Sequence, residues 1–170
     1  MEPRIETTVA AIYIHGDRKS LPVDTDPTPM LSMPQVNAHK GRGLMEDKRY
    51  FRPRVEGLIR RRQVSLIDEA TIQRHERVFG PIAWNLVKSQ IILAGEVPLS
   101  QYLGATLSFE DGPDLLLSLE REPCYAMDLI HHGLREAMKG GLQGALALVT
   151  SDGPIKVDQR VLVRIPAPTV

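Results

Sequence analysis

The stretch "ATLSFEDGPDLLLSLE", residues 105–120, contains two apolar runs with a turn between them. The runs at 105–109 and 114–120 have the length and composition of short β-strands. Asp111-Gly112 lies between them and is a strong signal for a tight hairpin, because both residues accept the backbone angles that such a turn needs. The stretch therefore predicts two antiparallel strands.

Runs of the same kind occur along the rest of the chain. We expect further strands at residues 7–15, 34–39, 56–67, 85–93, 145–150 and 160–165. A helix is expected at 69–79, with Asp68 as N-cap and Gly80-Pro81 as its end, and a shorter one at 133–139. Seven or eight short strands with two or three helices predict a mostly β fold. Its expected form is a closed or partly open β-barrel with peripheral helices.

The length of 170 residues suits a single domain, residues 1–170, with its core at about 5–165. Four prolines at 16–34 predict a long surface loop there, either a lid or a plain connector. The first residues lack the basic start and apolar run of a secretory signal, and no apolar stretch is long enough for a membrane helix. We therefore expect a cytoplasmic protein that does not bind membranes.

Acidic and basic residues balance at 21 each, so overall charge gives no indication of a nucleic-acid partner. The charges are nevertheless separated along the chain. Residues 40–62 carry nine basic and three acidic residues, a net of +6, whereas residues 96–128 carry a net of −6. The basic segment could receive an anion while the whole molecule stays neutral.

Cys124 is the only cysteine in the chain and directly follows Pro123 at the end of an expected strand. Arg121 and the backbone N–H groups of a following helix would favour its thiolate form. The carboxylates that would oppose this are Glu120, Glu122 and Asp128. Without a Cys-x-x-Cys pair, thioredoxin-like exchange is not expected. One thiolate can still carry sulfur as a persulfide or bind a soft metal, and the alternative is a buried, inert cysteine.

Several segments, in this order along the chain, resemble the MOSC family, named for the C-terminus of molybdenum cofactor sulfurase. "KGRGLMEDKRYF" (40–51) resembles the family's Gly-Leu-x-Gly-Asp-Arg segment, although Glu46 stands where glycine is usual. "NLVKSQIIL" (85–93) resembles its Asn-Ile-Val strand, and "LEREPCYAMD" (119–128) resembles the part that carries its cysteine. The segments "QVSLIDEATIQRHERVFG" and "GGLQGALALVTSDGPIKVDQRV" resemble other parts of small bacterial standalone members.

The resemblance implies a barrel akin to the β-barrel domain of pyruvate kinase, with Cys124 at the position of the family cysteine. That cysteine would carry sulfur for metal–sulfur centres, or ligate molybdenum in members that bind the molybdenum cofactor. A cysteine desulfurase would be the sulfur donor, and a metal–sulfur or molybdenum enzyme the acceptor. No pyridoxal phosphate site is expected in this chain. The alternatives are a molybdenum-dependent reductase of N-hydroxylated compounds and a non-catalytic binding module with a buried Cys124.

Candidate residues for binding the cofactor follow from the basic segment and the resemblance. Phosphate binding through charge and glycine N–H groups is expected at residues 40–49, with a solvated loop as the alternative. The full candidate set is Lys40, Arg42, Asp47, Lys48, Arg49, Asn85 and Arg121. Arg60, Arg61 and Arg62 are expected to alternate along a strand on a charged barrel exterior. The five histidines lack the spacing of a zinc site.

Overall fold

The computed structural model describes residues 2–16, 28–51 and 60–168 of the chain. Its strands are β1 Arg4–Ile14, β2 Leu31–Ser32, β3 Gln35–His39, β4 Gly43–Leu44, β5 Val64–Asp68, β6 Ile91–Leu93, β7 Thr106–Phe109, β8 Asp114–Glu120, β9 Ala145–Val149, β10 Gly153–Lys156 and β11 Arg160–Arg164. Its α-helices are α1 Glu69–Phe79, α2 Ala126–Ile130 and α3 Leu134–Ala137. The described residues confirm the expected mostly β fold.

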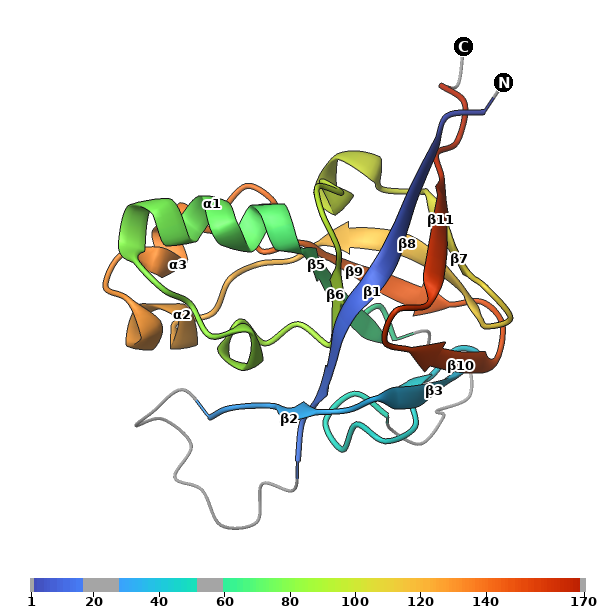
Figure 1. Ribbon diagram of the computed structural model, residues 1–170, viewed down its shortest axis with the longest axis horizontal. Coiled ribbons are helices and arrows are strands. Elements are labelled where there is room, and N and C mark those ends of the chain that lie inside the picture. Colours follow the sequence, from blue (N-terminus) through green and yellow to red (C-terminus); the bar gives the residue numbers. More distant parts are fainter. Residues whose placement is uncertain (1, 17–27, 52–59, 169–170) are drawn as a thin grey trace.

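Seven strands of the described chain form a closed barrel in the order β11-β7-β8-β9-β5-β6-β1. The barrel closes because the first half of β1 pairs with β11, while its second half pairs with β6 after a bulge between Val9 and Ala11. β2 continues the sheet outside the barrel, and β10, β3 and β4 form a small separate sheet. The start of β1 and the end of β11 lie together at one end of the barrel (Figure 1).

The hairpin predicted from the opening stretch is present. β7 and β8 pair antiparallel with Leu107 opposite Leu115, and Asp111 in the turn has a φ of 52°. Alternate residues of both strands are buried and belong to the barrel core. Alternation with one face inward is the pattern that a barrel wall requires.

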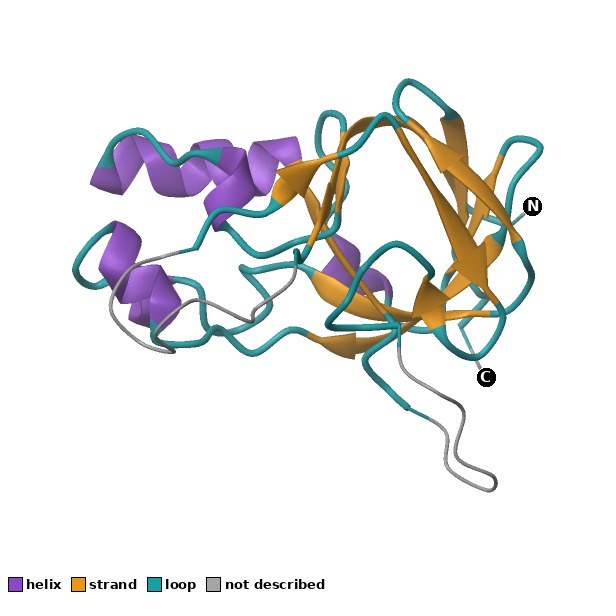
Figure 2. Ribbon diagram, turned by 90° about the horizontal axis from the view of Figure 1, so that it is seen from below, coloured by secondary structure: helices purple, strands orange, loops and turns teal. Residues whose placement is uncertain are grey.

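β5 and β6 pair differently from the antiparallel hairpin of β7 and β8. They are parallel, with Leu66 opposite Ile91, because α1 connects them as a crossover. β5 is buried at every position: Leu66 belongs to the barrel core, while Ile67 packs against Ile72 of α1 in a second core under the helices. Figure 2 shows the helices gathered on one side of the strands.

The predicted helix at 69–79 is confirmed, and its start differs in one detail. Asp68 holds the N-cap position with an extended backbone, but its side chain makes no cap hydrogen bond. The Asp68 carboxylate instead accepts a hydrogen bond from the Val97 N–H at 3.1 Å. Gly80 ends the helix with a φ of 95°. The later helical prediction at 133–139 corresponds to the shorter α3.

Some segments differ in extent from their prediction. The expected strand at 85–93 is a strand only at β6, and residues Trp84–Leu86 form a 3₁₀ turn. Lys88 has a φ of 61°, which interrupts an extended backbone. β10 lies between the two expected strands at 145–150 and 160–165 and was not expected. Residues 17–27 of the expected proline-rich loop lie outside the described residues. No described helix is long and apolar enough to cross a membrane.

Candidate functional site

Cys124 lies between β8 and α2, and its side chain is exposed. Its carbonyl accepts a hydrogen bond from the Met127 N–H at 3.1 Å, so the residue stands at the turn that leads into α2. The hypothesis of a buried thiol is therefore wrong. An exposed sulfur is accessible to a donor, an acceptor or a metal centre.

Arg121 is a buried positive charge three residues before Cys124. Only 4% of it is exposed, and its Nη1 donates to the Ser89 hydroxyl at 3.0 Å. Burial lowers the pKa of Arg121 from its usual value; attraction to Tyr50 and Cys124 raises it, and repulsion from Arg62 and Arg49 lowers it. A guanidinium stays protonated even so. Arg121 Nε is buried and has no hydrogen-bond partner within the described residues.

A cavity of about 320 Å³ lies among basic residues, and we refer to it as the arginine pocket. Its lining consists of Arg49, Tyr50, Arg60, Arg61 and Arg62. Among residues 2–16, 28–51 and 60–168, no carboxylate lines this cavity and no ion pair to these arginines occurs. Four guanidinium groups around one cavity repel one another, and an anion would relieve that repulsion.

The expectation that residues 60–62 alternate along a strand is wrong. These arginines precede β5 instead of alternating along it, and residues 56–59 of the expected strand lie outside the described residues. The pairing of β5 with β9 starts only at Val64. Before it, the side chain of Gln63 occupies the Val149 N–H, which its Oε1 accepts at 2.8 Å. The backbone before Gln63 is thus released from the sheet and brings the three arginines to the pocket.

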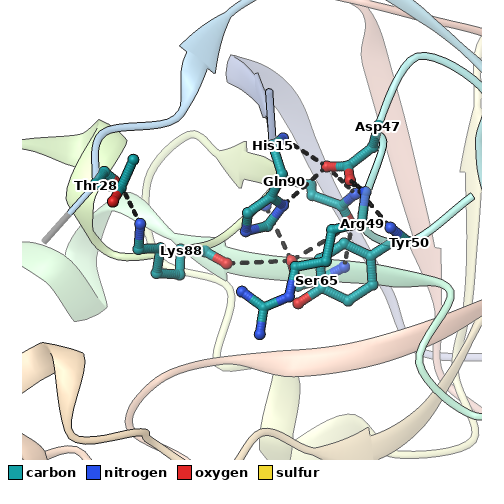
Figure 3. A network of polar contacts seen from close by, with 8 residues as sticks. All are labelled: His15, Thr28, Asp47, Arg49, Tyr50, Ser65, Lys88 and Gln90. Carbon is teal, nitrogen blue, oxygen red and sulfur yellow. Dashed lines mark hydrogen bonds and ion pairs between the residues drawn. The ribbon is translucent and has the colours of Figure 1, made fainter. Parts of the chain in front are cut away.

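Asp47 is fully buried and holds the chain that presents two lining residues. Its Oδ1 accepts the backbone N–H groups of Arg49 at 2.8 Å and Tyr50 at 3.1 Å. Its Oδ2 accepts from His15 N, His15 Nδ1 and Gln90 Nε2 (Figure 3). Burial alone would raise the pKa of Asp47, but these hydrogen bonds outweigh burial and lower it. Asp47 therefore stays ionised and sets the conformation of the pocket wall.

His15 supports the same wall from the end of β1. Its ring packs on Tyr50, with 5.2 Å between the ring centres. Burial lowers the pKa of His15 despite the opposing attraction of Asp47. Because a carboxylate only accepts, Nδ1 of the neutral ring carries the proton that bonds Asp47. Nε2 then carries the lone pair, and it is buried without a partner in the described part of the chain.

The remaining candidates of the basic segment do not line the arginine pocket. The Lys40 N–H donates to Asp152 at 2.6 Å on the turn between β3 and β4. Arg42 stacks its guanidinium on the Phe51 ring, 4.0 Å from the ring centre. The side chain of Lys48 is exposed. Of the four basic candidates between 40 and 49, only Arg49 lines the arginine pocket.

Asn85 lies in the 3₁₀ turn and not at the start of a strand. Its carbonyl accepts the Met30 N–H at 2.9 Å. Ser89 follows four residues later and reaches Arg121, so this segment contacts the site through a residue that was not among the candidates. Ser89, Tyr50 and His15 carry no local sequence motif. Only the tertiary packing brings Ser89 to Arg121 and His15 to Tyr50.

A larger cavity of about 640 Å³ lies elsewhere on the barrel. It is lined by parts of β1, β7 and β11, with Thr8, Ser108 and Arg160 among its residues. None of the candidates from the sequence lines it. We therefore place the candidate site at Cys124, Arg121 and the arginine pocket.

No family model and no curated protein matches this sequence. Solved structures do match the fold. YuaD from Bacillus subtilis superposes with a TM-score of 0.80 at 18% identity, covering 98% of this chain and 100% of YuaD. YiiM from Geobacillus stearothermophilus gives 0.67 at 16% identity, with 92% and 74% covered, and YiiM from Escherichia coli gives 0.65 at 14%, with 98% and 73% covered. YuaD and YiiM are MOSC-type proteins, and these likenesses support a MOSC-like fold for this chain.

Proposed function

We propose that this protein is a MOSC-type sulfur-carrier or molybdenum cofactor-binding domain, with Cys124 as the residue that holds sulfur or ligates molybdenum. The observation that carries the proposal is the exposed Cys124 sulfur within electrostatic reach of the buried Arg121. Positive charge beside a thiol favours the thiolate, which is the form that attacks sulfur and binds metals.

As a sulfur carrier, Cys124 would react with a persulfide on a cysteine desulfurase. The Cys124 thiolate attacks the terminal sulfur of the donor, and a new sulfur–sulfur bond forms. The donor's own sulfur–sulfur bond breaks, and its cysteine leaves as a thiolate. The transferred sulfur keeps its proton, so the step needs no external oxidant or reductant. Arg121 would stabilise the negative charge before and after the transfer.

The residues of the site also fit a molybdenum cofactor. Cys124 would supply the metal ligand, because a thiolate suits a soft metal site. The arginine pocket would hold the phosphate of the pterin, since Arg binds phosphate through paired hydrogen bonds. When bound, the cofactor would supply a metal centre for two-electron chemistry, and the reduction of N-hydroxylated compounds is the enzymatic version of this proposal. The protein would contribute binding, orientation and positive charge.

Mass spectrometry of the purified protein tests the carrier version. After incubation with a cysteine desulfurase and cysteine, wild type should gain the mass of one sulfur atom on the peptide that contains Cys124. Cys124→Ser is the matched control and should gain none. If the wild-type protein stays unmodified while a known sulfur carrier gains sulfur under the same conditions, the proposed carrier function is wrong.

Metal analysis tests the cofactor version. Protein made in a host that synthesises the cofactor should contain molybdenum, and Cys124→Ser should contain less. Absence of molybdenum in wild type, together with no reduction of a hydroxylamine substrate, would exclude the reductase. A protein that fails both this test and sulfur loading would be a binding module with an exposed but unused cysteine.

A further inference from the structure

The cavity of about 640 Å³ crosses the outer face of three barrel strands, and we refer to it as the outer groove. Its lining comes from β1, β11 and β7 and from residues 94–95 after β6. The helices lie on one side of the barrel and β7 and β11 on the other, so the helices leave this face uncovered (Figure 1). The volume is within the range of pockets that hold a whole small molecule.

Strand register decides which side chains form the floor of the outer groove. Val161 and Phe109 point into the barrel core, so the residues that alternate with them face outward. On that outer face Glu6 of β1 lies opposite Leu162 of β11, and Leu162 lies opposite Ser108 of β7. The partly exposed Leu162 is therefore an apolar surface with a carboxylate on one side and a hydroxyl on the other.

The charges of the outer groove do not balance. Next to the row of Glu6, Thr8 lies opposite Arg160, and the Arg160 carbonyl accepts the Glu110 N–H at 2.9 Å. Arg160 Nη1 lies 3.8 Å from the Glu110 carboxylate, so these two charges offset each other. Glu6 lines the groove as well, and among residues 2–16, 28–51 and 60–168 it forms no ion pair. One carboxylate is thus left for a cation from outside.

The wall beyond β1 leaves room for the rest of such a ligand. An added Cβ at Gly95 would contact nothing within 4 Å, so open space lies beside this residue. Ala94 and Leu162 add apolar groups to the lining. A molecule with a positive end at Glu6 would therefore place a hydrocarbon part against apolar side chains, where burial is favourable.

We infer that the outer groove is a binding site for small organic ammonium ions, with the ammonium at Glu6 and the hydrocarbon part on Leu162. An ammonium group donates hydrogen bonds that a carboxylate accepts, and the pair gains from opposite charge. An anion of the same shape would be repelled by Glu6. The site does not involve Cys124 and is separate from the proposed function.

Hexylammonium, hexanol and hexanoate test the charge selection, because they share one hydrocarbon chain and are cationic, neutral and anionic. Amide chemical shifts of the intact protein are followed by NMR as each compound is added. Hexylammonium should shift amides at residues 6–8, 94–95, 108–110 and 160–162. Since Glu6 is at the surface, we expect its binding to be tighter than that of hexanol by about threefold at low salt, with hexanoate the weakest. The difference should shrink as salt is raised.

Two variants and a matched control locate the site. Glu6→Gln should lose the preference for hexylammonium and still bind hexanol. Thr8→Trp puts a large side chain into the groove and should weaken both compounds. Glu2→Gln removes an exposed carboxylate that does not line the groove, and it should keep the preference. An undiminished preference in Glu6→Gln would overturn the inference, as would equal affinities of the three compounds for wild type.

A second copy of the chain is the rival occupant of this face. If the same amides shifted when the protein was concentrated without any ligand, and sedimentation showed a dimer, the face would be an interface and the inference would be wrong. Sulfur loading on Cys124 is measured separately. Its failure would refute the carrier function and leave the binding of ammonium ions to the outer groove unaffected.

Discussion

Asp47 accepts two hydrogen bonds from His15 on one carboxylate oxygen, from the backbone N at 2.8 Å and from the ring Nδ1 at 3.0 Å. The pair joins the end of β1 to the segment that presents Arg49 and Tyr50 to the arginine pocket. Both residues are buried, so neither bond is replaced by water when it is lost.

Asp47→Asn should lower the free energy of unfolding by about 3 kcal/mol, because the amide offers one acceptor oxygen to a set of five donors. Urea unfolding followed by circular dichroism measures the change. Asp111→Asn is the control, since Asn tolerates the positive φ of that exposed turn residue. If the two variants proved equally stable, the central role of Asp47 would be wrong.

Stability should fall as the solution is acidified, because His15 and Asp47 both have a lowered pKa in the folded protein. The unfolded chain then binds more protons than the folded one. The contribution of His15 is complete above its unfolded pKa of about 6.5 and declines as the pH falls through its lower folded value. The contribution of Asp47 to stability is complete above about pH 3.9 and is lost as the pH falls further through its lower folded pKa.

Urea unfolding between about pH 8 and pH 5 tests the share of His15, since Asp47 stays ionised in that range. His15→Asn keeps a donor for Asp47 but does not titrate, so its stability should vary less across the range than that of wild type. An equally steep curve for this variant would show that other groups cause the dependence.

Gly144→Ala should destabilise the protein by about 3 kcal/mol or more. Gly144 has a φ of 84°, and an added Cβ would lie 2.0 Å from the Leu66 carbonyl oxygen of β5. The Gly144 carbonyl also accepts the Arg121 N–H at 3.2 Å, so the shift would reach the candidate site. Thermal unfolding and the reaction rate of Cys124 would both report it.

Gly140→Ala is the matched control for this prediction. Gly140 has a similar φ of 75°, but an added Cβ would contact nothing within 4 Å. It should therefore lose only the backbone preference, about 1 kcal/mol. Similar losses for Gly144→Ala and Gly140→Ala would contradict the close approach of Gly144 to β5.

Arg121→Met should slow the alkylation of Cys124 by iodoacetamide by about threefold or more, since the variant removes the electrostatic attraction between Arg121 and Cys124. The methionine keeps the apolar part of the side chain buried. Ser89→Ala keeps the guanidinium and should retain most of the rate. An unchanged rate in Arg121→Met would show that Arg121 does not influence the sulfur.

Short-range patterns were sufficient to predict much of the barrel. The hairpin at β7 and β8 follows from alternating apolar residues around Asp111-Gly112, and the helix at α1 follows from its cap positions and apolar spacing. These signals come from neighbours in the chain, so they can be read without the fold. The parallel pairing of β5 with β6 could not be predicted in this way, because it depends on how α1 packs between the two strands in the chain.

The candidate site likewise combines features that the sequence predicts with features that depend on the fold. By itself the sequence determined a mostly β fold and a lone Cys124 followed by a turn and close to Arg121. Only the tertiary structure decided that Cys124 is exposed, that Arg121 is buried, and that Arg60–Arg62 precede β5 and join Arg49 at one cavity. The physical reason is that burial and electrostatic interactions depend on contacts between distant segments. In this protein those contacts run through Gln63 and Val149, Arg121 and Ser89, and Asp47 and His15.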